Sequence, residues 1–279
     1  MEHISKKAKH CTSELSWPLI KGVMLDLSGT IHVELESIPG APAAVRDLLD
    51  SELKVRFVTN STKKCKSMLI EELCKAGFTG LKEECIFTSA TAARRLVEGR
   101  SLRPYLLVEP ALEPDFEGLS QENPNCVVVG LAPSRFDYSR MNQAFRLVMD
   151  GAVLIAIHKG RYWRDSDGGL SLGPGPFVAG LEYAAGVQSE IVGKPTGSFF
   201  NSALEDMGLK PEECIMIGDD LKDDVGGAMK IGMPGFLVKT GKYLPKDESD
   251  PDIKPSSVYK DVVAAIEDIL HLKSSQIGV

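Results

Sequence analysis

Short apolar runs alternate with amphipathic stretches along most of the chain. The first run, 23–25, leads into Asp26, and turn-forming residues follow it directly. A short apolar run bounded by turn residues is typical of a strand buried in a parallel sheet. Helical periodicity follows over 42–53, and an alternating strand pattern over 54–59. This β/α alternation predicts an α/β fold built on a parallel sheet.

The same alternation continues to the end of the chain. Further strands are expected over 85–88, 104–108, 126–130, 153–157, 189–193, 214–217 and 235–239. Further helices are expected over 62–76, 90–98, 138–149, 177–185, 198–207, 222–231 and 262–272. The segments 161–163 and 169–172 flank the turn-rich residues 165–168 and predict a β-hairpin.

We expect these elements to form two parts. Residues 17–89 and 187–279 share one β/α texture, which predicts a Rossmann-like parallel-sheet core. Residues 90–186 are expected to form an inserted α/β cap domain, and residues 1–16 a flexible leader. An insertion at a loop end of a Rossmann-like sheet is well placed to cover the ligand crevice and exclude water.

The composition narrows the class of protein. The chain has 279 residues, 43% of them hydrophobic, which is enough for a large core, and its net charge is −7. This charge argues against a general surface for nucleic acid or anionic membrane, but not against a small anionic substrate. No apolar run approaches the roughly 18 residues that span a bilayer. With no signal peptide and six scattered cysteines, we expect a cytoplasmic protein.

Polar residues stand where four of the predicted core strands end. They are Asp26 with Ser28, Thr59 with Asn60, Lys194, and Asp219–Asp220 with Asp224 a few residues later. The carboxyl ends of parallel strands lie on one edge of a sheet, so these groups are expected to meet. Each of them has a simpler explanation when taken alone. Asp26, Thr59 and Asn60 suit turns, Lys194 suits solvent, and the later aspartates suit a helix N-terminus.

The joint pattern favours phosphoryl chemistry. Carboxylates on neighbouring strand ends suit Mg²⁺, a hard ion that takes oxygen ligands. A lysine and a Thr-Asn pair nearby would neutralise and hydrogen-bond a phosphoryl group. Phosphoryl transfer needs little beyond positioning, charge neutralisation and an in-line nucleophile, and an aspartate can be that nucleophile.

The motifs DLSGT, VTN, GKP and GDDLKDDVGGA occur in this order. Together they resemble those of the haloacid dehalogenase-like phosphatase superfamily. The resemblance spans about 23–232 and implies a C2-type cap, phosphatase activity, a Mg²⁺ cofactor and a possible homodimer. The implied substrate is a small phosphorylated molecule or a phosphoprotein side chain.

The resemblance also implies roles for individual residues. Asp26 would be the nucleophile, and Lys194 would neutralise both it and the phosphate. Thr59 and Asn60 would bind phosphoryl oxygens. Mg²⁺ would be held by Asp26, the main-chain carbonyl of Ser28 and Asp219, with Asp224 close by or acting through water.

Ser28 departs from the family pattern, which usually has a second aspartate at this position as general acid and base. Such help is typically worth ~10²–10⁴-fold in rate, and serine cannot supply it near neutral pH. Leaving groups that need little acid help should therefore be favoured, namely phosphohistidine or phospholysine, pyrophosphate and aryl phosphates. One alternative is a phosphate- and Mg²⁺-binding protein with vestigial catalysis that acts through a partner. A response-regulator-like phosphoacceptor is disfavoured by the inserted module.

Polar and aromatic side chains of the cap also follow a predicted strand. His158 is the candidate substrate-binding residue among them, with Lys159, Arg161, Tyr162 and Trp163 beside it. The alternative is that His158 only bonds to backbone or faces solvent. His32, shortly after the first motif, is expected at most to line the entrance to the site.

Overall fold

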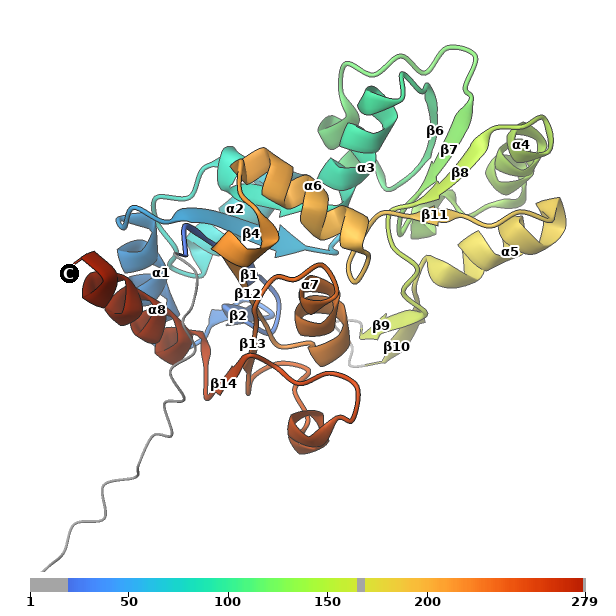
Figure 1. Ribbon diagram of the computed structural model, residues 1–279. Coiled ribbons are helices and arrows are strands. Elements are labelled where there is room, and N and C mark those ends of the chain that lie inside the picture. Colours follow the sequence, from blue (N-terminus) through green and yellow to red (C-terminus); the bar gives the residue numbers. More distant parts are fainter. Residues whose placement is uncertain (1–19, 165–168, 278–279) are drawn as a thin grey trace, which may run out of the picture.

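The computed structural model describes residues 20–164 and 169–277 (Figure 1). The predicted leader over 1–16 and the predicted turn over 165–168 lie outside the described residues. In the parts of the chain that are described, no helix has both the length and the apolar character needed to cross a membrane.

A six-stranded sheet forms the core, in the order β14-β13-β12-β1-β4-β5, with every pair parallel. The central strand β1 (Gly22–Asp26) is buried along its whole length. Its neighbours are β12 (Cys214–Gly218) and β4 (Lys54–Thr59). The outer strands are β5 (Ile86–Thr88), β13 (Gly235–Val238) and β14 (Ser257–Tyr259). The parallel-sheet core predicted from the apolar runs is confirmed.

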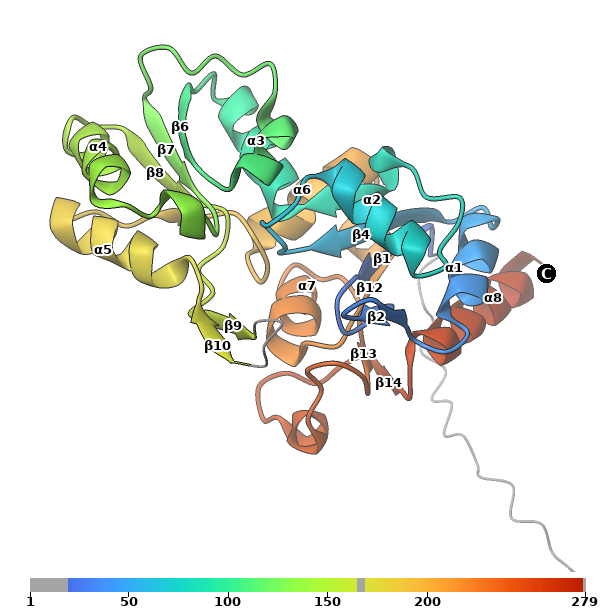
Figure 2. The ribbon, with the colours of Figure 1, turned by 180° about the vertical axis from the view of Figure 1, so that it is seen from behind.

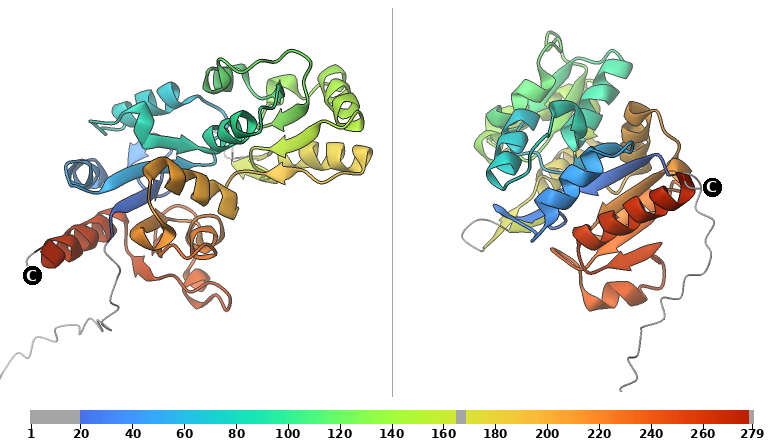
Figure 3. Two further views of the ribbon diagram at one scale, coloured as in Figure 1. Left: turned by 45° about the horizontal axis from the view of Figure 1, so that its top comes forward. Right: turned by 90° about the vertical axis from the view of Figure 1, so that its left-hand side faces the viewer.

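Side chains of β1 alternate between two apolar layers. Val23 and Leu25 pack in the same cluster as residues of α1 (Ala41–Leu49), α2 (Lys66–Lys75) and α8 (Val262–Ile277). Met24 points to the other face, where α3 (Ser89–Gly99) and α6 (Gly197–Met207) cover the sheet. The core is therefore a three-layer α/β unit, as the two turned views of Figure 3 show.

The inserted module has a parallel sheet of its own, in the order β11-β8-β7-β6. Its strands are β6 (Pro104–Leu107), β7 (Cys126–Val129), β8 (Val153–Ala156) and β11 (Glu190–Ile191). Helices α4 (Tyr138–Met149) and α5 (Gly175–Ala185) pack together on one face of this sheet (Figure 2). On the other face, Val128 and Ile155 join the apolar cluster that contains Met24. One continuous cluster thus connects the module, hereafter the cap, to the core.

The strand expected over 189–193 was predicted to lie in the core sheet, and this is wrong. Glu190 and Ile191 instead pair with Ile155 and Ala156 of β8 at the edge of the cap sheet. Val192 continues the contact, since its amide donates to the Ala156 carbonyl at 3.0 Å. We propose that the cap ends after Ile191, so that Lys194 follows a strand of the cap.

Several shorter elements complete the described structure. The predicted hairpin is present as β9 (Tyr162–Arg164) and β10 (Leu170–Leu172), and a second hairpin pairs β2 (His32–Val33) with β3 (Glu36–Ser37). The helix expected over 222–231 is instead a π-helix, η5 (Leu221–Gly226), followed by α7 (Gly227–Met229). The 3₁₀ turns are η1 (Glu83–Cys85), η2 (Pro110–Phe116), η3 (Pro133–Arg135), η4 (Pro211–Glu213) and η6 (Pro245–Ser249).

Candidate active site

Two of the predicted acidic residues meet at the centre of the core sheet. β1 and β12 are neighbours with Leu25 opposite Ile217, so Asp26 and Asp219 lie at adjacent strand ends. Asp224 joins them from the π-helix that begins just after β12. A Cβ on Gly218 would lie only 2.4 Å from the Cβ of Asp224, so the close approach of Asp224 requires glycine at this position.

Lys194 bridges two of these carboxylates. Its Nζ lies 2.5 Å from Asp26 Oδ1 and 2.6 Å from Asp224 Oδ1, and all three side chains are buried. Burial alone would lower the pKa of Lys194, but Asp224 and Asp26 outweigh it and raise that pKa above its ordinary value. The lysine is therefore a fixed positive charge at neutral pH. Burial raises the pKa of Asp26 against the opposing effect of Lys194, and it raises the pKa of Asp224 to about 7.

Asp219 completes a cluster suited to a metal ion. Asp26, Asp219 and Asp224 each offer an oxygen, and these three atoms lie within 4.8 Å of one another. Burial, reinforced by Asp224, raises the pKa of Asp219 to about 6. Three buried carboxylates therefore share this space with the buried ammonium of Lys194, and a divalent cation with oxygen preference would offset the excess negative charge. The donor set fits Mg²⁺.

Ser28 lies in the turn between Asp26 and the β2–β3 hairpin, and it is exposed. Backbone hydrogen bonds of this turn are accepted by the carbonyls of Leu27 and His32. Gly29 has φ +94°, and a Cβ there would lie 2.1 Å from Asp219 Oδ2. The turn is thus packed directly against the acidic cluster. That the Ser28 carbonyl is a metal ligand stays a prediction.

The predicted phosphoryl-binding pair ends β4 beside the cluster. Thr59 is buried, and its hydroxyl oxygen accepts from the Ser61 amide at 3.1 Å. The carboxamide of Asn60 is directed at the backbone of Lys194: Nδ2 donates to the Lys194 carbonyl and Oδ1 accepts from the Lys194 amide, both at 2.9 Å. Asn60 therefore contacts the backbone of Lys194, an arrangement that its position in the sequence did not indicate.

The structure places His158 between cap and core. Its Nδ1 accepts from the Gly160 amide at 3.2 Å, so Nε2 carries the proton and faces Thr62 Oγ1 at 3.3 Å. The Thr62 hydroxyl also accepts from the Leu131 amide of the cap at 3.1 Å. Burial, aided by the charge of Lys242, lowers the pKa of His158 to about 4, so the ring is neutral near pH 7. A substrate contact by His158 stays a prediction.

Comparison with known proteins assigns this arrangement to a family. A "Haloacid dehalogenase-like hydrolase" model matches residues 23–120, and a "HAD-hyrolase-like" model matches residues 191–265. The chain is 51% identical over 251 residues to haloacid dehalogenase-like hydrolase domain-containing protein 2 of Bos taurus, covering 90% of this chain and 96% of that one. The chain belongs to the haloacid dehalogenase-like hydrolase family. The predicted enzyme class and superfamily are confirmed.

Two further members of the haloacid dehalogenase-like group are similar over most of their length. Phospholysine phosphohistidine inorganic pyrophosphate phosphatase of Danio rerio is 42% identical, covering 90% of this chain and 94% of that one. The crystal structure of a 4-nitrophenylphosphatase from Thermotoga maritima has a TM-score of 0.81 at 26% identity, covering 89% of this chain and 97% of that one. The likeness extends through the inserted module and confirms the expected Rossmann-like core with a C2-type cap.

Two residues of this haloacid dehalogenase-like site were not among the predicted ones. The Thr30 hydroxyl lies 3.3 Å from Asp219 Oδ1 and 3.5 Å from Asp26 Oδ2. The amide of Lys242 donates to Asp219 Oδ2 at 2.6 Å, and its Nζ pairs with Asp220 at 3.1 Å. The sequence signal that could have indicated Lys242 is the Gly-Lys step shortly after β13. Strand β13 is a neighbour of β12, and the carboxyl ends of both strands lie on the same edge of the sheet.

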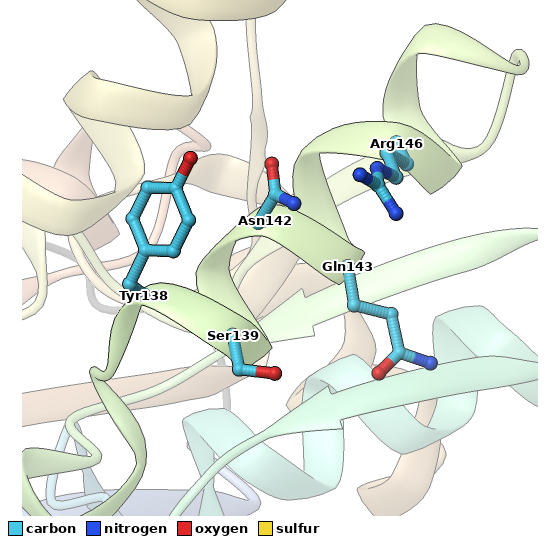
Figure 4. A pocket seen from close by; sticks show the side chains of 5 residues that line it. All are labelled: Tyr138, Ser139, Asn142, Gln143 and Arg146. Carbon is cyan, nitrogen blue, oxygen red and sulfur yellow. The ribbon is translucent and has the colours of Figure 1, made fainter.

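A shallow groove lies on the outer face of the cap, away from these groups. Figure 4 shows the side chains that line it, all from α4: Tyr138, Ser139, Asn142, Gln143 and Arg146. Tyr138 is 85% exposed. None of the predicted site residues of this haloacid dehalogenase-like enzyme lines the groove, so the groove lies apart from the candidate site.

Proposed function

We propose that the chain is a Mg²⁺-dependent phosphatase that acts through an aspartyl-phosphate on Asp26. The observation that carries the proposal is the buried Lys194 ammonium held between Asp26 and Asp224, beside the third carboxylate of Asp219. Lysine removes the repulsion between a carboxylate nucleophile and an anionic phosphate. When bound by Asp26, Asp219 and Asp224, with the Ser28 carbonyl as a further ligand, Mg²⁺ would neutralise phosphoryl charge.

The residues of the chain suit a two-step displacement. An Asp26 oxygen attacks phosphorus, the bond from phosphorus to the leaving group breaks, and the leaving group departs with the bonding electrons. Water then attacks the phosphorus of the aspartyl-phosphate, which releases inorganic phosphate and restores the Asp26 carboxylate. We expect Thr59, the last residue of the neighbouring strand β4, to bond phosphoryl oxygens. The cap contacts the loop after β4 at this edge of the sheet, and we expect it to limit access of bulk water during the first step.

Ser28 decides which leaving groups are favoured. Its hydroxyl is too weak an acid to protonate a departing group near neutral pH, so a leaving group must depart with little acid help. We propose a preference for phosphohistidine, phospholysine, pyrophosphate and aryl phosphates over alkyl esters. The names of the Danio rerio relative and of the Thermotoga maritima structure support this choice of substrates.

The test is a set of initial rates with Mg²⁺ on four substrates: imidazole phosphate, pyrophosphate, p-nitrophenyl phosphate and glycerol phosphate. We expect the first three to be turned over faster than glycerol phosphate, and Asp26→Asn to abolish turnover of all four. Equal or faster hydrolysis of glycerol phosphate would refute the leaving-group argument. Full activity in Asp26→Asn would refute the assignment of the nucleophile.

A second candidate function follows from the same serine. A protein that binds phosphate and Mg²⁺ through Lys194 and the three aspartates, but turns over little without an acid at position 28, would act through a partner. Metal and phosphate binding with no turnover of any of the four substrates would favour it. In either case the proposed ligand is a small phosphorylated molecule or a phosphorylated side chain, and a homodimer and a cytoplasmic location remain expectations from the sequence.

A further inference from the structure

The backbone of Lys194 lies where the chain passes from the cap to the core. Two residues earlier, Val192 is still bonded to Ala156 of the cap, and α6 of the core begins three residues later at Gly197. Lys194 is therefore not positioned by a strand of the core sheet. Its ammonium nevertheless has to meet Asp26, at the end of the central strand of that sheet.

Asn60 is the side chain that fixes this backbone to the core. Its carboxamide forms two hydrogen bonds of 2.9 Å with the amide and carbonyl of Lys194, as one peptide group does with another in a sheet. Asn60 follows β4 directly, and β4 is a neighbour of β1, which ends in Asp26. The two hydrogen bonds therefore connect the backbone of Lys194 to the strand beside the proposed nucleophile. One N–H donor and the carbonyl oxygen of the carboxamide are used for this contact.

Gly193 shows how closely the chain passes at this point. A Cβ there would lie 2.5 Å from the carbonyl oxygen of Ile157 in the cap and 2.7 Å from Oδ1 of Asn60. Only glycine fits between a cap carbonyl and the core carboxamide without displacing one of them. The residue before Lys194 is therefore packed closely between the cap and the core, and on the core side its neighbour is Asn60.

We propose that Asn60 is a positioning residue that holds the Lys194 ammonium on Asp26 and Asp224, and that its main contribution to phosphate binding passes through Lys194. The inference rests on the catalytic role proposed for Lys194. It differs from the expectation that Asn60 itself binds phosphoryl oxygens, because the two hydrogen bonds of its side chain go to the backbone of Lys194. Removing the amide should loosen Lys194 without changing the charge of the site.

The first measurement is the rate at which acetic anhydride acetylates Lys194 in the metal-free protein, mapped by mass spectrometry against the exposed Lys260. In the wild type Lys194 is buried and bonded to two carboxylates, so it should react slowly. We expect Asn60→Ala to raise this rate at least fivefold. An unchanged rate in Asn60→Ala overturns the proposal.

Asn125→Ala is the matched control. Oδ1 of Asn125 accepts from the Arg103 amide at 2.7 Å in the cap, so the variant also loses an amide-to-backbone hydrogen bond, but at a distant place. It should leave Lys194 acetylation unchanged, with both alanine variants melting cooperatively by circular dichroism. A comparable rise in Asn125→Ala would mean that acetylation follows general loosening, and the proposal would fall.

The second measurement is a double-mutant cycle on the affinity for inorganic phosphate with Mg²⁺. Asn60→Ala should weaken binding about tenfold in the wild type and less than twofold in Lys194→Met. An equal loss in both backgrounds would show that Asn60 binds phosphate itself and overturn the proposal. If acetylation responds as expected but the wild type neither binds phosphate nor hydrolyses any of the four substrates, the proposed function fails while the positioning of Lys194 by Asn60 stands.

Discussion

Replacing Lys194 by methionine tests the electrostatic balance of the site directly. The substitution keeps most of the side-chain volume and removes the charge that pairs with Asp26 and Asp224. Removing one partner of a buried ion pair typically costs ~3–5 kcal/mol. Part of this cost is relieved because burial already raises the pKa of Asp224 to about 7, so that carboxyl can take up a proton when its partner is lost. We therefore expect a loss of about 3 kcal/mol in the free energy of unfolding without metal.

The assay is urea denaturation in EDTA and in Mg²⁺, with Lys159→Met as the matched control. Lys159 pairs with Glu182 in the cap but is 30% exposed, so its loss should cost about 1 kcal/mol or less. Mg²⁺ should recover part of the stability of Lys194→Met, because an ion bound by the carboxylates replaces the missing positive charge. The turnover of p-nitrophenyl phosphate should fall at least ~10²-fold. Equal stability of the two variants in EDTA would refute the reasoning.

Three further predictions follow from the same geometry. Gly241→Ala should weaken Mg²⁺ binding by about tenfold, because a Cβ there would lie 2.1 Å from Asp219 Oδ2. Gly232→Ala is the control in a calorimetric titration: Gly232 also has a positive φ, but no atom lies within 4 Å of the added Cβ, so Mg²⁺ binding should not change. Ser28→Asp should raise the rate on glycerol phosphate relative to p-nitrophenyl phosphate by about tenfold or more, since it restores an acid, and an unchanged rate ratio would contradict this. In EDTA, the free energy of unfolding should rise by about 2 kcal/mol as pH falls from about 7.5 to about 5.5. The reason is that the raised pKa values of Asp219, Asp223 and Asp224 make the folded state bind protons more tightly than the unfolded state. Urea denaturation at the two pH values measures the change, and a fall in stability would contradict the prediction.

The sheet edge that brings Asp26 and Asp219 together could be predicted from the sequence. Both residues follow apolar runs, and neighbouring parallel strands bring their carboxyl ends to one edge. Asp224 could be predicted as well, because it lies only five residues after Asp219. These placements depend on local patterns and on one general rule of sheet topology.

The position of Lys194 could not be derived in this way. The strand that precedes Lys194, β11, has only two paired residues. Whether it joins the cap sheet or the core sheet depends on its contacts with β8, which lies more than thirty positions earlier in the chain. Lys242 is similar, because its amide reaches Asp219 only when the loop after β13 folds back over the Gly29 turn, where Thr240 Oγ1 donates to the Gly29 carbonyl at 2.5 Å. Tertiary contacts of this kind leave no periodic signal.

The short loop after β4 contacts both Lys194 and the cap. Asn60 holds the Lys194 backbone, and two residues later the Thr62 hydroxyl accepts from the Leu131 amide and meets His158. The adjacent Lys63 places its ammonium over the ring of Trp163 in the β9–β10 hairpin. A displacement of the cap therefore pulls on the same few residues that position Lys194. Because the bonds of Thr62 and Asn60 lie in one short stretch of backbone, substitutions at the cap contacts of this loop should affect turnover even where the side chain never reaches the substrate.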